Sequence, residues 1–122
     1  MKILIIEDEA GYQKILKSSF EKEGFEVIIS RDAEQGRVEV IKNRPDIILL
    51  DIILPSGLNG FDFLEQLKAD KKSQNIPVVV ITNLETEEKV SKEIGADFYF
   101  VKAATTIPQI IEKIKELVNF NT

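Results

Sequence analysis

One strand and the acid that follows it constrain this chain more than any other feature. Residues 47–50 are four consecutive apolar residues, which predicts a strand buried on both faces. Asp51 follows directly, ahead of a loop that is broken by Pro55, Gly57 and Gly60. In open α/β sheets, the carboxyl ends of the strands leave a crevice where ligands bind. Asp51 is therefore the leading candidate for chemistry, and the alternative is that it only caps the next loop or helix.

Four further short apolar runs predict strands, and each is separated from the next by a segment with helical spacing. The predicted strands are residues 3–6, 25–29, 47–50, 78–81 and 98–101. Their runs are nearly continuous rather than alternating, which is typical of parallel sheets covered by helices on both faces. The right-handed crossover rule then favours an α/β fold with a doubly wound, five-stranded parallel sheet.

The five predicted helices follow the strands, and apolar spacing indicates the faces of four of them. The predicted core positions are Ile15, Leu16 and Phe20 in the first helix, Phe61, Leu64 and Leu67 in the third, Val90 and Ile94 in the fourth, and Ile107, Ile110, Ile111, Ile114, Leu117 and Val118 in the last. Asp32 opens a weaker second helix, in which Gly36 costs about 1 kcal/mol relative to Ala.

Composition narrows the classes of function. The 122 residues fit one domain, residues 1–122, and a net charge of -5 without a basic run argues against nucleic-acid binding. The chain has no cysteine for disulfides or thiol chemistry, and no histidine, so a phosphohistidine step must occur on another protein. Its apolar runs are too short for a membrane span, and its beginning is unlike a signal peptide, so we expect a cytoplasmic protein.

Five polar residues are predicted to meet at the carboxyl edge of the sheet: Glu7, Asp8, Asp51, Thr82 and Lys102. Two carboxylates about 4 Å apart repel by roughly 4 kcal/mol at an effective dielectric constant of 20, so the cluster needs a proton or a cation. Oxygen ligands without His or Cys favour Mg²⁺. Taken separately, the acids are equally compatible with a solvated helix start, and Thr82 with a helix cap.

Together these residues supply what phosphorylation of a carboxylate requires. Asp51 would be the nucleophile, Lys102 a point charge for the phosphoryl oxygens and Thr82 a hydrogen-bond donor, beside a cation held by the acids. Lys102 could equally serve to balance the acids.

The chain resembles the receiver domains of bacterial two-component response regulators over essentially its whole length. The matching pieces, in chain order, are Ile6-Glu7-Asp8-Glu9, Leu50-Asp51-Ile52-Ile53-Leu54-Pro55, Val80-Ile81-Thr82, Gly95-Ala96-Asp97, and Tyr99 three residues before Lys102. The resemblance implies a flavodoxin-like (βα)5 fold with strand order 2-1-3-4-5.

The resemblance also implies roles for the site. Asp51 would accept a phosphoryl group from a partner's phosphohistidine, while Glu7, Asp8, Asp51 and the backbone carbonyl of Ile53 would hold Mg²⁺. Lys102 would contact the phosphoryl oxygens together with the threonine at the end of the fourth strand. The chain would be a switch and not an enzyme, with at most slow autodephosphorylation.

Switching would depend on Thr82 and Tyr99. By the resemblance, Thr82 moves toward the phosphoryl group and Tyr99 turns inward, which remodels the face built by residues 85–94, 98–101 and 107–118. The implied partners are a histidine kinase or phosphotransfer protein and a downstream protein target, without direct binding to nucleic acid or membrane. A homodimer through this face is left open.

Three departures from the family pattern lead to further expectations. Ala103 stands where the family usually has a proline after the lysine, which predicts a trans peptide bond and a shifted loop. Asn83 is larger than the usual small residue and would narrow the phosphoryl pocket or form a hydrogen bond across it. Ile53 and Leu84 are apolar where relatives place polar side chains that position water, which predicts a long-lived phosphoryl state.

Other functions fit less well. A phosphohydrolase of the haloacid dehalogenase type would have an acid two residues after Asp51, where this chain has Ile53. A flavodoxin-like cofactor binder would need a phosphate-binding loop in place of three acids. The main alternative is a degenerate receiver that binds partners without being phosphorylated, which Asn83 and Ala103 favour and the retained acids and Lys102 oppose.

Overall fold

The computed structural model describes residues 1–54 and 59–118, so Pro55 and Gly57 of the predicted loop lie outside the described residues. Within these ranges, five strands alternate with five α-helices and one 3-10 helix. In chain order the elements are β1 (Lys2–Ile6), α1 (Ala10–Lys22), β2 (Glu26–Ser30), α2 (Ala33–Asn43), β3 (Ile47–Leu50), α3 (Gly60–Ala69), β4 (Val78–Thr82), α4 (Glu88–Ile94), β5 (Phe98–Val101), η1 (Lys102–Ala104) and α5 (Ile107–Leu117).

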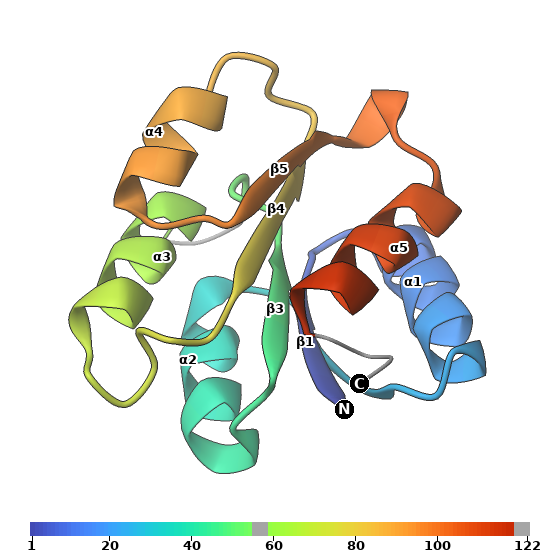
Figure 1. The fold of residues 1–122 in the computed structure, drawn as a ribbon, viewed down its shortest axis with the longest axis horizontal. Coiled ribbons are helices and arrows are strands. Elements are labelled where there is room, and N and C mark those ends of the chain that lie inside the picture. Colours follow the sequence, from blue (N-terminus) through green and yellow to red (C-terminus); the bar gives the residue numbers. More distant parts are fainter. Residues whose placement is uncertain (55–58, 119–122) are drawn as a thin grey trace.

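The strands form one parallel sheet in the order β2-β1-β3-β4-β5, which confirms the predicted doubly wound fold. Helices α1 and α5 cover one face of the sheet, and α2, α3 and α4 cover the other (Figure 1). Alternate residues of each central strand enter the two cores: Ile48 and Leu50 join one, and Ile47 and Leu49 join the other. This double burial is why the strands are apolar throughout.

The predicted helix faces are correct for α3 and α5 and partly wrong for α1 and α4. In α1, Leu16 and Phe20 are buried, but Ile15 is 53% exposed because it lies about 100° around the helix from Leu16. In α3, Leu64 and Leu67 are buried and Phe61 packs against the same core, which Phe63 also joins. In α4, Val90 is exposed and Ser91 lies inside.

Across the described residues, none of the helices combines the length and apolar composition that crossing a membrane would require.

Two glycines hold helices close to the sheet. Gly60, predicted to lie in the loop, instead begins α3, and a Cβ there would be 2.3 Å from the Cα of Ile52. Gly36 is buried in α2, where a Cβ would be 2.7 Å from Cδ1 of Ile6 and 3.4 Å from the Phe63 ring. The close approach explains why α2 keeps a residue of poor helix propensity.

Gly36→Ala is therefore expected to destabilise the domain by about 1 kcal/mol, because overpacking outweighs the gain of about 1 kcal/mol in helix propensity. Chemical denaturation measures the change. In an Ile6→Val background, which lacks the Cδ1 atom, the same substitution should be neutral or stabilising. An equal effect in both backgrounds would show that the contact with Ile6 is not the cause.

Candidate functional site

The ends of three parallel strands bring the central polar residues together. Ile6 of β1 pairs with Leu50 of β3, so the next residues, Glu7 and Asp51, leave the sheet side by side. Lys102 directly follows β5, and Asp8 follows Glu7. The backbone N–H of Asp51 donates to the carbonyl of Ile6 at 3.0 Å, which continues the ladder to the edge.

Lys102 links the two buried acids. Its Nζ lies 2.7 Å from Oε1 of Glu7 and 3.0 Å from Oδ2 of Asp51. Glu7 is 1% exposed and Asp51 5% exposed, so both charges are largely removed from water. Buried charges are stable only when paired and hydrogen-bonded, and this lysine provides a shared partner for both.

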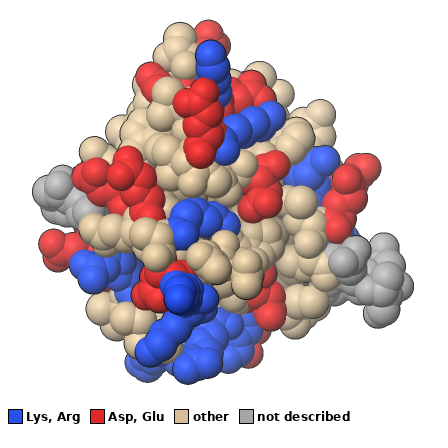
Figure 2. Space-filling view, turned by 60° about the vertical axis from the view of Figure 1, so that its left-hand side comes forward, with Lys and Arg blue, Asp and Glu red and all other residues tan. Residues whose placement is uncertain are grey.

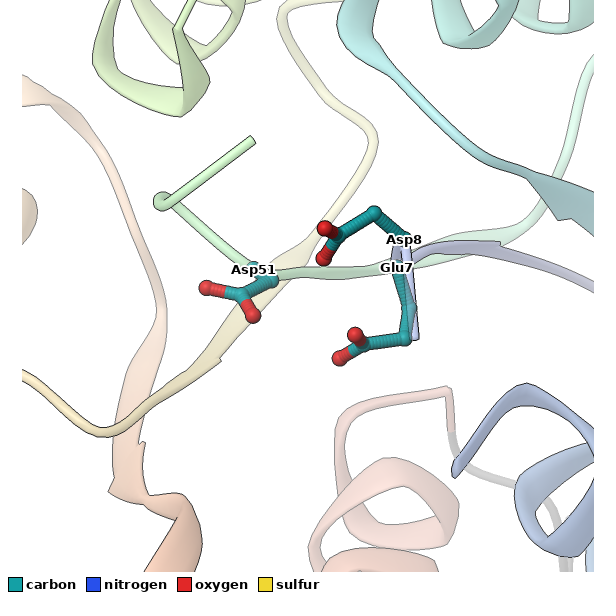
Figure 3. Close-up of side chains that lie close together, drawn as sticks. All are labelled: Glu7, Asp8 and Asp51. Atoms are coloured by element: carbon teal, nitrogen blue, oxygen red, sulfur yellow. The ribbon is translucent and has the colours of Figure 1, made fainter. Parts of the chain in front are cut away.

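Asp8 completes a cluster of three carboxylates. Glu7, Asp8 and Asp51 each offer an oxygen, and these three oxygens lie within 4.8 Å of one another. Figure 3 shows the three side chains grouped beyond the strand ends. Asp8 is exposed, so the cluster opens to solvent on its side. The predicted convergence of the acids with Lys102 is what the structure shows.

Backbone groups fix the orientation of both buried carboxylates. The second oxygen of Glu7, Oε2, accepts from the backbone N–H of Glu9 at 2.9 Å. Oδ1 of Asp51 accepts from the backbone N–H of Ile53, also at 2.9 Å. In each carboxylate, one oxygen thus accepts from a backbone N–H and the other contacts Lys102, and both contacts hold the acid in place.

The site carries more negative than positive charge. Burial raises the pKa of the Glu7 carboxyl, against the opposing hydrogen bond and charge of Lys102. Burial alone would lower the pKa of Lys102, but the hydrogen bond to Glu7 and the charge of Asp51 raise it overall. One ammonium therefore faces three carboxylates, and the imbalance favours a further cation.

Two residues of α1 belong to the site although the sequence analysis did not single them out. The ring of Tyr12 lies 4.7 Å from Nζ of Lys102, a cation–π contact. The Gln13 amide donates to the backbone carbonyl of Glu7.

Glu9 accepts from the N–H groups of Gly11 and Tyr12 and so begins the helix. Of the three acids in a row, the third is therefore a helix cap, and only Glu7 and Asp8 face the site.

The two predicted switch residues converge on Leu84. Thr82 is fully buried at the end of β4, and its Oγ1 lies 3.4 Å from the backbone N–H of Leu84. Tyr99 is buried too, and its hydroxyl donates to the carbonyl of Leu84. Tyr99 therefore already occupies the inward position that was expected to follow phosphorylation. Contact of Thr82 with Asp51 remains a prediction.

Asn83 and Ala103, which both depart from the family pattern, form a hydrogen bond with each other. Oδ1 of Asn83 accepts from the backbone N–H of Ala103 at 3.0 Å, which joins the loop after β4 to the turn after β5. A proline at position 103 would lack this donor. The Lys102–Ala103 bond is trans, as predicted, since residues 1–54 and 59–118 contain no cis peptide bond. Asn83 therefore forms a hydrogen bond to the residue after Lys102, while its effect on the phosphoryl pocket stays a prediction.

Asn83→Ala is expected to destabilise the domain by about 1 kcal/mol, because the Ala103 N–H loses its partner. Ala103→Pro removes the donor, so its cost should be smaller by about 1 kcal/mol in the Asn83→Ala background than in the wild type. Urea denaturation of the four proteins measures this coupling. Strictly additive effects would mean that the bond contributes nothing to stability.

Comparison with known proteins assigns the family. The model of the response regulator receiver domain matches residues 3–115. Sporulation initiation phosphotransferase F of Bacillus subtilis is 34% identical over 119 residues, which cover 96% of this chain and 90% of that protein. The phosphate regulon transcriptional regulatory protein PhoB of Escherichia coli is 33% identical over 119 residues, 96% of this chain and 51% of that protein. The chain thus spans only about half the length of the PhoB relatives.

A solved structure confirms the fold. The receiver domain of a sensor histidine kinase from Pseudomonas aeruginosa, solved with a magnesium ion coordinated in its active site cleft, aligns with a TM-score of 0.86 at 21% identity, covering 97% of each chain. The match of the family model, the related sequences and the shared fold agree with the site geometry. The chain therefore belongs to the response regulator receiver domain family of two-component signal transduction.

Proposed function

We propose that this receiver domain accepts a phosphoryl group on Asp51 from a phosphohistidine of a partner protein. The observation that carries the proposal is the buried Asp51 carboxylate, held by Lys102 and the Ile53 N–H beside two further acids. In the transfer, an Asp51 oxygen would bond to phosphorus while the bond from phosphorus to the partner's imidazole nitrogen breaks. The imidazole leaves with that electron pair and takes up a proton.

The donor set fits Mg²⁺. Three carboxylates within 4.8 Å offer only oxygen ligands, and the single ammonium leaves them undercompensated. Glu7, Asp8, Asp51 and the backbone carbonyl of Ile53 would hold the ion. When bound, Mg²⁺ would offset the negative charge that the incoming phosphoryl group adds. The magnesium in the cleft of the Pseudomonas aeruginosa domain supports this assignment by analogy.

Lys102 and Thr82 would contact the transferred phosphoryl group. Lys102 is already held 3.0 Å from Asp51 and needs no large movement to reach a phosphoryl oxygen. Thr82 lies at the end of the adjacent strand, β4, and its weak 3.4 Å contact with Leu84 leaves the hydroxyl available as a donor.

The proposed readout starts at Leu84. If Thr82 turns toward the phosphoryl group, the contact with Leu84 is lost, and Leu84 is also where the Tyr99 hydroxyl is bound. The change would reach the face formed by α4, β5 and α5, where a downstream protein or a second copy could respond. The domain would serve as a switch, with at most slow autodephosphorylation and no turnover of an external substrate.

The phosphoryl group is expected to be lost slowly. Ile53, which is 51% exposed, and Leu84 present no polar side chain that could orient an attacking water. Decay of the phosphorylated form, followed by intact-mass spectrometry after removal of the donor, should be slow in the wild type and several-fold faster in Ile53→Gln. Rapid decay of the wild-type adduct would refute the expectation. Because Ile53 is exposed, this substitution should leave the core intact.

Incubation with Mg²⁺ and acetyl phosphate tests the function itself. A single added phosphoryl mass is the expected result. An unmodified mass, with the fold intact by circular dichroism, would contradict the proposal and favour the alternative of a degenerate receiver.

A further inference from the structure

The described part of the chain has a hollow away from the acidic site. It is a groove of about 680 Å³ between α2 and α3. Its apolar lining includes Val40 and Ile41 of α2 with Phe63 and Leu67 of α3. Phe63 and Leu67 are buried in the core beneath, but Ile41 is 77% exposed, more than any other large apolar side chain in residues 1–54 and 59–118. An exposed isoleucine beside an open apolar groove is typical of an interaction surface.

The charge around this groove is opposite to that of the chain. Arg37, Lys71 and Lys72 line it, and none of the three forms an ion pair within the described residues. The one acid in the lining, Asp70, has a carboxylate oxygen 2.9 Å from the backbone N–H of Lys72, so that oxygen caps the turn. The lining therefore carries a charge of about +2, three cations against one acid, on a chain of net charge -5.

Figure 2 shows Lys and Arg side chains gathered at the lower end of the face that α2 and α3 share. Lys71 and Lys72 belong to the segment that directly follows α3. An apolar channel with unpaired cations at its margin matches a ligand that has apolar side chains flanked by carboxylates.

The groove lies away from Asp51. Helices α2 and α3 run antiparallel to the strands that they connect, so their C-terminal ends lie at the opposite edge of the sheet from the acids (Figure 1). The apolar groove residues of α2, Val40 and Ile41, belong to its second half, and Lys71 and Lys72 lie beyond the end of α3. An occupant of the groove would therefore leave the acidic site open to a phosphodonor.

We propose that the groove between α2 and α3 binds an acidic amphipathic helix of a partner protein, independently of phosphorylation. Apolar side chains at helical spacing would lie along the α2 and α3 walls and cover Ile41, as amphipathic helices do in apolar grooves. Glu or Asp side chains of the same helix would pair with Arg37, Lys71 and Lys72. The proposal does not depend on Asp51 being phosphorylated.

A pair of synthetic peptides tests this on the whole chain. One forms a helix with Leu along one face and Glu along the other, and its matched control has Lys in place of every Glu. Titration of the isotopically labelled domain should move the amide resonances of α2, α3 and residues 70–73, with the Glu peptide binding about tenfold or more tightly than the Lys peptide. Binding should be equal for the wild type and Asp51→Asn.

Two groove variants and one control complete the test. Ile41→Asp should weaken the Glu peptide about tenfold or more. Val38→Asp, at a position in the same helix that is 59% exposed but outside the lining, should bind as the wild type does. Lys71→Glu with Lys72→Glu should reverse the preference between the peptides, and this pair carries the test if Ile41→Asp unfolds.

Equal binding of both peptides, resonance changes confined to other faces, or no binding of the Glu peptide would overturn the proposal. So would a dimer of the free domain that Ile41→Asp dissociates, because a second copy would then be the occupant.

Discussion

Asp51→Asn should accept no phosphoryl group under conditions that fully label the wild type. The amide keeps the shape of the carboxylate but loses the charge that makes its oxygen a nucleophile. The fold should survive, because the substitution removes one of three clustered negative charges and leaves Lys102 paired with Glu7 at 2.7 Å. Intact-mass spectrometry after incubation with Mg²⁺ and acetyl phosphate measures the effect.

The control for Asp51→Asn is Asp62→Asn, which removes a carboxylate from the first turn of α3, outside the carboxylate cluster. It should be labelled to the same extent as the wild type. An adduct that persists in Asp51→Asn would place the acceptor elsewhere in the chain.

Lys102→Met should destabilise the domain by about 3 to 5 kcal/mol in the absence of divalent cations. The substitution leaves Glu7 and Asp51, which are 1% and 5% exposed, as neighbouring buried charges without their shared partner. It also removes the cation–π contact with Tyr12. The free energy of unfolding from urea denaturation measures the loss. Adding Asp51→Asn should recover part of the lost stability, because it removes one of the two unpaired buried carboxylates.

Lys17→Met provides the matched comparison. Lys17 forms an equally short ion pair with Glu21, 2.6 Å, but both side chains are 48% exposed. Exposed pairs contribute about 1 kcal/mol or less, so this substitution should have little effect. Similar small losses for both lysines would mean that the buried charges of the site are far better solvated than the structure indicates.

The strands and the central acids could be predicted because local sequence alone determines them. A run such as residues 47–50 has few alternatives to a doubly buried strand, and parallel topology then brings Glu7 and Asp51 to one edge. The sequence does not show that Glu7 is the more buried of the two acids or that it makes the shorter contact with Lys102.

Features that depend on packing between distant segments could not be predicted. Tyr12 has no motif that indicates a contact with a lysine ninety positions later, and its contact with Lys102 depends on how α1 packs beside α5. Asn83 and Ala103 each depart from the family pattern, but their hydrogen bond depends on the loop geometry. The prediction that Val90 of α4 is buried is wrong because two apolar residues do not define a helical face.

The location and metal dependence of the phosphoryl group test the account most directly. The domain would be treated with acetyl phosphate in Mg²⁺ or in EDTA and mapped by tandem mass spectrometry. The account predicts label only in Mg²⁺, and only on the peptide that contains Asp51. Label on any other residue, or equal labelling in EDTA, would contradict it.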